Sequence, residues 1–240
     1  MIVSWFSAGV SSAVATWLLR DQIDRIIYIH IDDQHPDTER FLVDCEQWFG
    51  RPIERLQSPL KSVENACRQR AYVNGVRGAS CTLMLKRRAR KEWEVDHDDL
   101  TYVWGFDLAE QHRVDRLLQS MPEQQHLFPL VDNELTKQDT HGILAKAGIT
   151  RPAMYDLGYP NNNCIGCVKG GKGYWNKIRR DFPEVFKQRA EMERLIGASC
   201  INGVYLDELD PKAGVTSKPI LQDCGIYCEI TAAATGGGEG

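Results

Sequence analysis

Short apolar runs alternate with segments of helical periodicity through the first 150 residues. An almost wholly apolar, β-branched run such as Arg25–Ile31 is typical of a strand that is covered on both faces. Helices are predicted where apolar residues recur at helical spacing. The predicted strands span residues 2–6, 25–31, 52–56, 101–105 and 126–130, and the predicted helices span 13–20, 37–49, 61–73, 83–95, 108–119 and 137–147. This alternation predicts an α/β fold with a parallel, Rossmann-like sheet that binds ligands at the carboxyl ends of its strands.

The pattern changes after about residue 150. Prolines and three consecutive asparagines, Asn161 to Asn163, mark irregular chain, and a glycine-rich stretch follows. Helices are predicted again over 174–180 and 183–196, whereas 197–228 lacks clean periodicity. We therefore expect an α/β domain over 1–150, a cysteine-containing, mostly helical or irregular region over 151–230 packed on it, and a disordered tail over 231–240.

Composition excludes two broad classes of protein. The net charge of −4 argues against a globally basic nucleic-acid binder, although a local basic patch stays open. No apolar run is long enough to span a membrane, and the chain opens without an export signal, so we expect a cytoplasmic protein. The sequence leaves association into a homo-oligomer open.

The turn after the first strand is the leading candidate for a binding site. Ser7, Gly9, Ser11 and Ser12 lie between an apolar strand and a helix start. Free backbone amides, the positive end of a helix dipole and a glycine together make a cradle for phosphate. The alternative is an ordinary strand-to-helix turn with Ser11 or Ser12 as the N-cap residue.

Other candidate residues follow strands at the same predicted edge of the sheet. Asp32 ends the second strand and is suited to a ribose, a base edge or a metal ion, with turn formation as the alternative. Gly105 ends the strand at 101–105 in an equivalent position. Lys86 and Arg87 begin a run of five cations in six residues, which predicts either an anion or nucleic-acid contact or a solvated helix face.

Eight cysteines without a secretion signal favour metal binding or redox chemistry over disulfides. Cys164 and Cys167 form one close pair and Cys224 and Cys228 another, while Cys81 stands alone at a helix start. Two close pairs far apart in sequence are typical of four-thiolate sites, which hold zinc or iron–sulfur clusters. The alternative is buried free thiols. Cys224 is equally suited to be a ligand or a nucleophile.

Together these motifs resemble the phosphoadenosine phosphosulfate (PAPS) reductase family of the PP-loop adenine nucleotide α-hydrolase superfamily. Residues 37–41, Asp-Thr-Glu-Arg-Phe, and residues 167–175 are similar in particular to its phage-borne and bacterial PAPS reductase-like members. The superfamily loop is S-G-G-x-D-S, and residues 7–12 match its first serine, second glycine and last serine but carry Ala8 and Ser11 elsewhere. Residues 223–226, Asp-Cys-Gly-Ile, resemble the motif of the reductases' nucleophilic cysteine, with Tyr227 in place of its histidine. Residues 80–81 are Ser-Cys where the iron–sulfur branch has two cysteines.

The resemblance implies specific roles and partners. It implies a nucleotide (PAPS, its analogue without the 3′-phosphate, or ATP) at Ser7, Gly9, Ser11, Ser12, Asp32, Lys86, Arg87 and Gly105. It also implies a [4Fe–4S] cluster, or alternatively zinc, on Cys81, Cys164, Cys167 and Cys228, with Cys224 as the alternative fourth ligand.

Three functions follow as alternatives. The first is sulfonucleotide reduction, with Cys224 as nucleophile, Lys86, Arg87 and Arg88 neutralising charge, and an external thiol such as thioredoxin as reductant. The second is an ATP-dependent sulfurtransferase that thiolates tRNA or DNA. The third is a non-catalytic nucleotide-binding protein with a zinc-stabilised C-terminal region.

Overall fold

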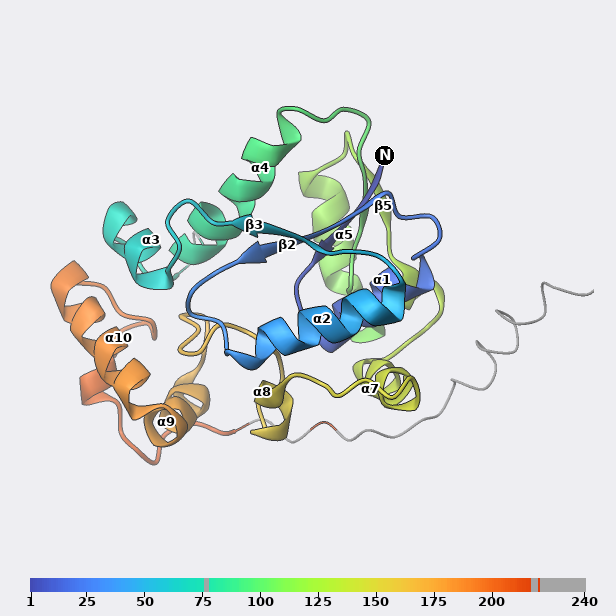
Figure 1. Ribbon diagram of the computed structural model, residues 1–240. Coiled ribbons are helices and arrows are strands. Elements are labelled where there is room, and N and C mark those ends of the chain that lie inside the picture. The colour runs from blue at the N-terminus through green and yellow to red at the C-terminus, as the bar shows by residue number, and fades with distance from the viewer. Residues whose placement is uncertain (76–77, 217–219, 221–240) are drawn as a thin grey trace, which may run out of the picture.

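A five-stranded, all-parallel sheet forms the centre of the molecule (Figure 1). The computed structural model describes residues 1–75, 78–216 and 220, so Cys224, Cys228 and the expected tail lie outside the described residues. The strands are β1 (Ile2–Phe6), β2 (Arg25–His30), β3 (Glu54–Gln57), β4 (Thr101–Val103) and β5 (Gln125–Leu127), in the order β3-β2-β1-β4-β5. This confirms the predicted α/β class with a Rossmann-like sheet.

Helices cover both faces of the sheet because successive strand residues point to opposite sides. Phe6 and Tyr28 pack on one face, beneath α1 (Val10–Leu18), α2 (Asp37–Phe49) and α7 (Lys137–Lys146). Val3, Ile27 and Tyr102 form the core of the other face, on the side of α4 (Arg88–Glu94) and α5 (Gln111–Ser120).

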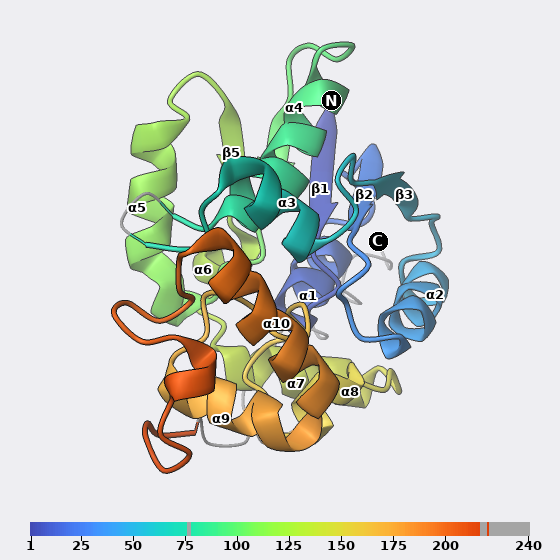
Figure 2. The ribbon, with the colours of Figure 1, turned by 90° about the vertical axis from the view of Figure 1, so that its left-hand side faces the viewer.

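A third core joins the chain beyond residue 150 to the sheet domain. It includes Ile31 after β2, Val63 of α3 (Val63–Arg70), and the fully buried Trp175 of α9 (Lys172–Asp181). Figure 2 shows α10 (Pro183–Ile196) beside α3. The short helices α6 (Pro129–Asp132) and α8 (Ala153–Asp156) complete the named α-helices of the described chain.

A buried ion pair fastens this C-terminal region to the end of β2. Asp33 pairs with Arg189 of α10, whose side chain is only 3% exposed, and the other Asp33 carboxylate oxygen accepts a hydrogen bond from the Val63 amide at 2.6 Å. The Asp33 carbonyl accepts from the Ile165 amide at 2.8 Å. One residue therefore positions α3, α10 and the loop that carries Cys164 and Cys167.

The segment predicted as a helix over 83–95 is not one regular helix. Thr82–Arg87 form a π-helical segment that runs directly into α4, a geometry often found at functional sites. The last predicted strand is shorter than expected because β5 ends at Leu127 and α6 begins at Pro129. Within the described residues, no helix is both long enough and apolar enough to cross a membrane.

Candidate functional site

A large cleft of about 900 Å³ lies at the carboxyl ends of the strands. The chain builds β1, β2 and β3 outward in one direction and then places β4 on the other side of β1, so the strand order reverses between β1 and β4. Ligands of open α/β sheets bind at such a reversal. Ser7, Gly9, Ser11, Ser12 and Gly105, all predicted from the sequence, line the cleft here.

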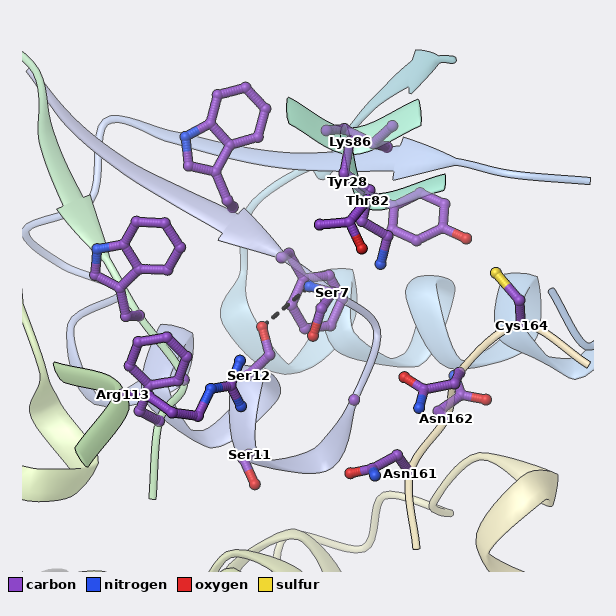
Figure 3. Close-up of a pocket in the computed structure, with 18 of the residues that line it drawn as sticks. Ser7, Ser11, Ser12, Tyr28, Thr82, Lys86, Arg113, Asn161, Asn162 and Cys164 are labelled. Carbon is purple, nitrogen blue, oxygen red and sulfur yellow. Dashed lines mark hydrogen bonds between the residues drawn. The ribbon is translucent and has the colours of Figure 1, made fainter. Parts of the chain in front are cut away.

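The turn after β1 has the shape of an anion cradle. Ala8 adopts a left-handed φ of 56°, and the Ser7 amide donates to the Ser12 hydroxyl at 3.1 Å (Figure 3). Gly9 is the N-cap of α1 and provides no side-chain cap, so the alternative of Ser11 or Ser12 as N-cap is wrong. Among the described residues, nothing accepts a hydrogen bond from the amides of Ala8, Gly9, Ser11 and Ser12. These amides, at the positive end of α1, are available to an anion.

Two side chains from beyond residue 150 hold this turn in place. The Asn162 side-chain amide donates to the Ala8 carbonyl at 2.7 Å, and the Tyr155 hydroxyl of α8 accepts from the Val10 amide at 3.3 Å. Tyr155 is buried, and burial raises the pKa of its hydroxyl. The hydroxyl therefore stays neutral and able to accept. Neither contact could be predicted from the sequence, since the partners lie about 150 residues apart.

Gly105 lies directly against the start of α1. A β-carbon on this residue would come within 2.6 Å of the Ser12 α-carbon and 2.9 Å of its nitrogen. Asp32, by contrast, does not line the cleft. Its half-exposed carboxylate lies 3.5 Å from His30, so the structure does not bring this predicted residue to the others.

Cations gather along one wall of the cleft. Lys86 and Arg87 of the π-helical segment line it as predicted, together with Lys169. Within the described chain, none of these three forms an ion pair with a carboxylate. Arg88 does not line the cleft and instead pairs with Glu92 at 2.7 Å, so it does not take the charge-neutralising role predicted for it. The three unpaired cations make this wall suited to an anionic ligand.

The thiols of Cys81, Cys164 and Cys167 line the same cleft. The Tyr174 hydroxyl fixes the loop of the last two, accepting from the Cys167 amide at 2.8 Å and donating to the Cys164 carbonyl. Burial raises the pKa of Cys81, and it raises the pKa of Cys164 to about 12, against the opposing effect of Lys86. These two cysteines are therefore protonated at neutral pH in this arrangement.

The described thiols do not by themselves fit a cluster or a zinc ion. Across residues 1–75 and 78–216, no three His, Cys, Asp or Glu side chains are grouped so that they could hold a metal. Ligation by Cys81, Cys164, Cys167 and Cys228 stays a prediction, because Cys228 lies outside the described residues.

An acid and a base that sequence reasoning did not single out also line the cleft. Burial raises the pKa of the Asp107 carboxyl and lowers the pKa of the Lys137 ammonium, and the two groups favour each other's charged form. Lys137 donates to the Asn161 side-chain carbonyl at 2.6 Å. Asp107 lies four residues after the end of β4 and Lys137 begins α7, and these positions at the carboxyl edge of the sheet are the signal that could have found them.

Fold and site together define a Rossmann-like α/β protein whose cleft contains several thiols and a turn with the shape of an anion cradle. A scan against models of protein families finds no match to this chain, and a search of curated proteins finds none either.

Proposed function

We propose that the chain is a PAPS reductase-like enzyme that binds an adenine nucleotide with its anionic group on the Ser7–Ser12 turn. The observation that carries this proposal concerns the part of the chain that the structure describes: three thiols and three cations without an ion-pair partner there lie in the same cleft as the free amides of the turn. Helix-start amides bind phosphate or sulfate, and thiols supply the electrons for reduction of sulfur. The same proposal includes membership of this Rossmann-like fold in the adenine nucleotide α-hydrolase superfamily.

The proposed reaction balances with an external dithiol. The Cys224 thiolate attacks the sulfur of an adenosine sulfonucleotide, forming a sulfur–sulfur bond and releasing the adenosine phosphate. A dithiol, for example of thioredoxin, then attacks the Cys224 sulfur and releases sulfite. The resulting mixed disulfide resolves to the oxidised dithiol and the Cys224 thiol, so the dithiol is oxidised by two electrons. Lys86, Arg87 and Lys169 offset the charge of the nucleotide.

Release of sulfite tests the proposal. Full-length protein is supplied with PAPS, or with its analogue that lacks the 3′-phosphate, and a dithiol. We expect sulfite from the unaltered protein, none from Cys224→Ser, and unchanged nucleotide affinity in that variant. Cys45→Ala is the control, because Cys45 is buried in α2 away from the cleft. Full release by Cys224→Ser, or none from any sulfonucleotide, contradicts the proposal.

A second candidate function is ATP-dependent thiolation of tRNA or DNA. The observation that favours it is the continuation of basic side chains out of the cleft. Arg87 lines both the cleft and a shallow hollow beside α4, where Lys91 lies together with Arg88 and its partner Glu92. Such a basic row is suited to a nucleic-acid backbone. This function predicts conversion of ATP to AMP that tRNA or DNA stimulates, and the absence of such stimulation would count against it.

A further inference from the structure

The cleft has two apolar walls, one on each side of the anion-binding turn. One wall comes from the end of β2 and the residues after it, with Tyr28 and Ile31, whereas Ile27 packs on the sheet face that carries Trp5 and Trp104. The other, which we call the aromatic compartment, is formed by Trp5, Trp104, Phe106, Leu117 and Met121. Figure 3 shows Tyr28 and Arg113 on opposite sides of the turn that carries Ser7 and Ser12.

In the aromatic compartment, two adjacent rings lie between two guanidinium groups. The Trp104 and Phe106 rings are nearly parallel, with an interplanar angle of 11° and centroids 5.8 Å apart. Arg113 lies over the Phe106 ring at 4.4 Å, and Arg90 lies 6.0 Å from the Trp104 ring centre. Trp104 and Phe106 are only partly buried, so both rings present surface to the cleft. Partly exposed aromatic rings beside arginines are suited to stack nucleobases.

A single nucleotide leaves one of these walls unused. An adenine nucleotide has one ring system and one anionic tail, and the anion-binding turn lies between the two walls. With the tail on the turn, its base reaches only one side. The cleft, at about 900 Å³, is also near the upper end of ordinary ligand pockets. The second wall therefore has the shape and the chemistry for a second planar ring.

We propose that the aromatic compartment binds the nucleobase of a second substrate beside the adenine nucleotide. This inference rests on the proposed binding of a nucleotide at the turn, and it adds a second ligand class. The ring stacks against Phe106 and Trp104, beside Arg113 and Arg90, whose guanidinium groups pair with Glu110 and Glu94. A free nucleotide and a base of a single-stranded nucleic acid share this chemistry.

Calorimetric titration of the full-length protein tests the inference. The protein is first saturated with AMP and then titrated with uridine monophosphate or with a short single-stranded oligonucleotide. We expect a second binding event, weakened about tenfold in Phe106→Leu and in Trp104→Leu, since a stacked base contributes about 1–3 kcal/mol. Tighter binding of the oligonucleotide than of the mononucleotide would identify nucleic acid as the source of the base.

Phe186 provides a matched control. It is also partly buried, and Arg179 lies over its ring at 4.4 Å, but it is outside the cleft. Phe186→Leu should leave both binding events unchanged. Absence of a second event, competition between the second probe and AMP, or a loss of AMP affinity in Phe106→Leu equal to the loss for the probe would overturn the inference.

The two proposals fail in different ways. If AMP does not bind, the proposed function falls, and titration of the nucleotide-free protein with the same probes still tests the aromatic compartment through Phe106→Leu. If AMP binds and no second ring does, only the inference of a second substrate falls.

Discussion

Gly105 packs against Ser12 with no space for a side chain between them. A β-carbon at Gly105 would lie 2.6 Å from the Ser12 α-carbon, closer than such atoms approach, and it would meet backbone that cannot rotate away. The chain just after β4 therefore sets the position of the turn after β1.

Gly105→Ala should displace the turn. We expect nucleotide affinity to fall about tenfold or more and stability to fall by about 1–3 kcal/mol, the usual cost of overpacking. Calorimetry with AMP and thermal unfolding measure the two effects. Gly171→Ala is the control, because a β-carbon there meets nothing within 4 Å. Affinity and Tm equal to those of the unaltered protein would show that the turn tolerates the displacement.

Adjacent aspartates should differ sharply in their effect on stability. Asp33→Asn breaks the pair with the buried Arg189 and leaves that charge uncompensated, a loss of about 3 kcal/mol. Asp32→Asn alters a half-exposed side chain outside the cleft and should change stability by less than about 0.5 kcal/mol. Urea unfolding compares the two variants. Nucleotide affinity should also be unchanged in Asp32→Asn. A large loss of nucleotide affinity in this variant would show that Asp32 belongs to the binding site.

His141 should make the protein sensitive to acid. This fully buried residue of α7 has no hydrogen-bond partner on either ring nitrogen among the described residues, and burial lowers its pKa from 6.5 to about 3. Between these values only the unfolded chain takes up the proton, so stability falls as the pH falls. The contribution amounts to a few kcal/mol, on the order of 1.4 kcal/mol for each pKa unit.

His141→Leu should therefore reduce the dependence of stability on pH between 6.5 and 3. Urea unfolding at several pH values measures this, with the exposed His112→Leu as control. An identical slope in the unaltered protein and in His141→Leu would contradict the assignment.

Cys164 should react slowly with alkylating reagents. Because burial raises the pKa of its thiol to about 12, its thiolate is scarce at pH 8. We expect iodoacetamide to modify it about a hundredfold more slowly in the folded protein than in urea, as measured by mass spectrometry of the Cys164 peptide. The rate should still rise with pH beyond 9. Rapid modification at neutral pH would show an activated thiolate instead.

The sequence predicts the elements of the sheet because buried parallel strands read as continuous apolar runs. It also finds Ser7, Ser12 and Gly105, since the carboxyl ends of strands are where such folds place their ligands. It misses Tyr155 and Asn162, whose roles depend on contacts with a turn about 150 residues away. The sequence prediction chose Asp32, whereas Asp33 is the aspartate that pairs with the buried Arg189. Periodicity does not distinguish two adjacent aspartates that follow the same strand.

Ala8, whose backbone is left-handed, is a point of contact between the first 150 residues and the chain that follows them. A non-glycine residue in this conformation costs about 1–2 kcal/mol, and the Asn162 amide on the Ala8 carbonyl helps to offset that cost. Residues 1–150 alone would lack this bond and the Tyr155 contact. The conformation of this turn therefore depends on residues beyond 150, and a protein cut at the predicted domain boundary would lack both of these contacts.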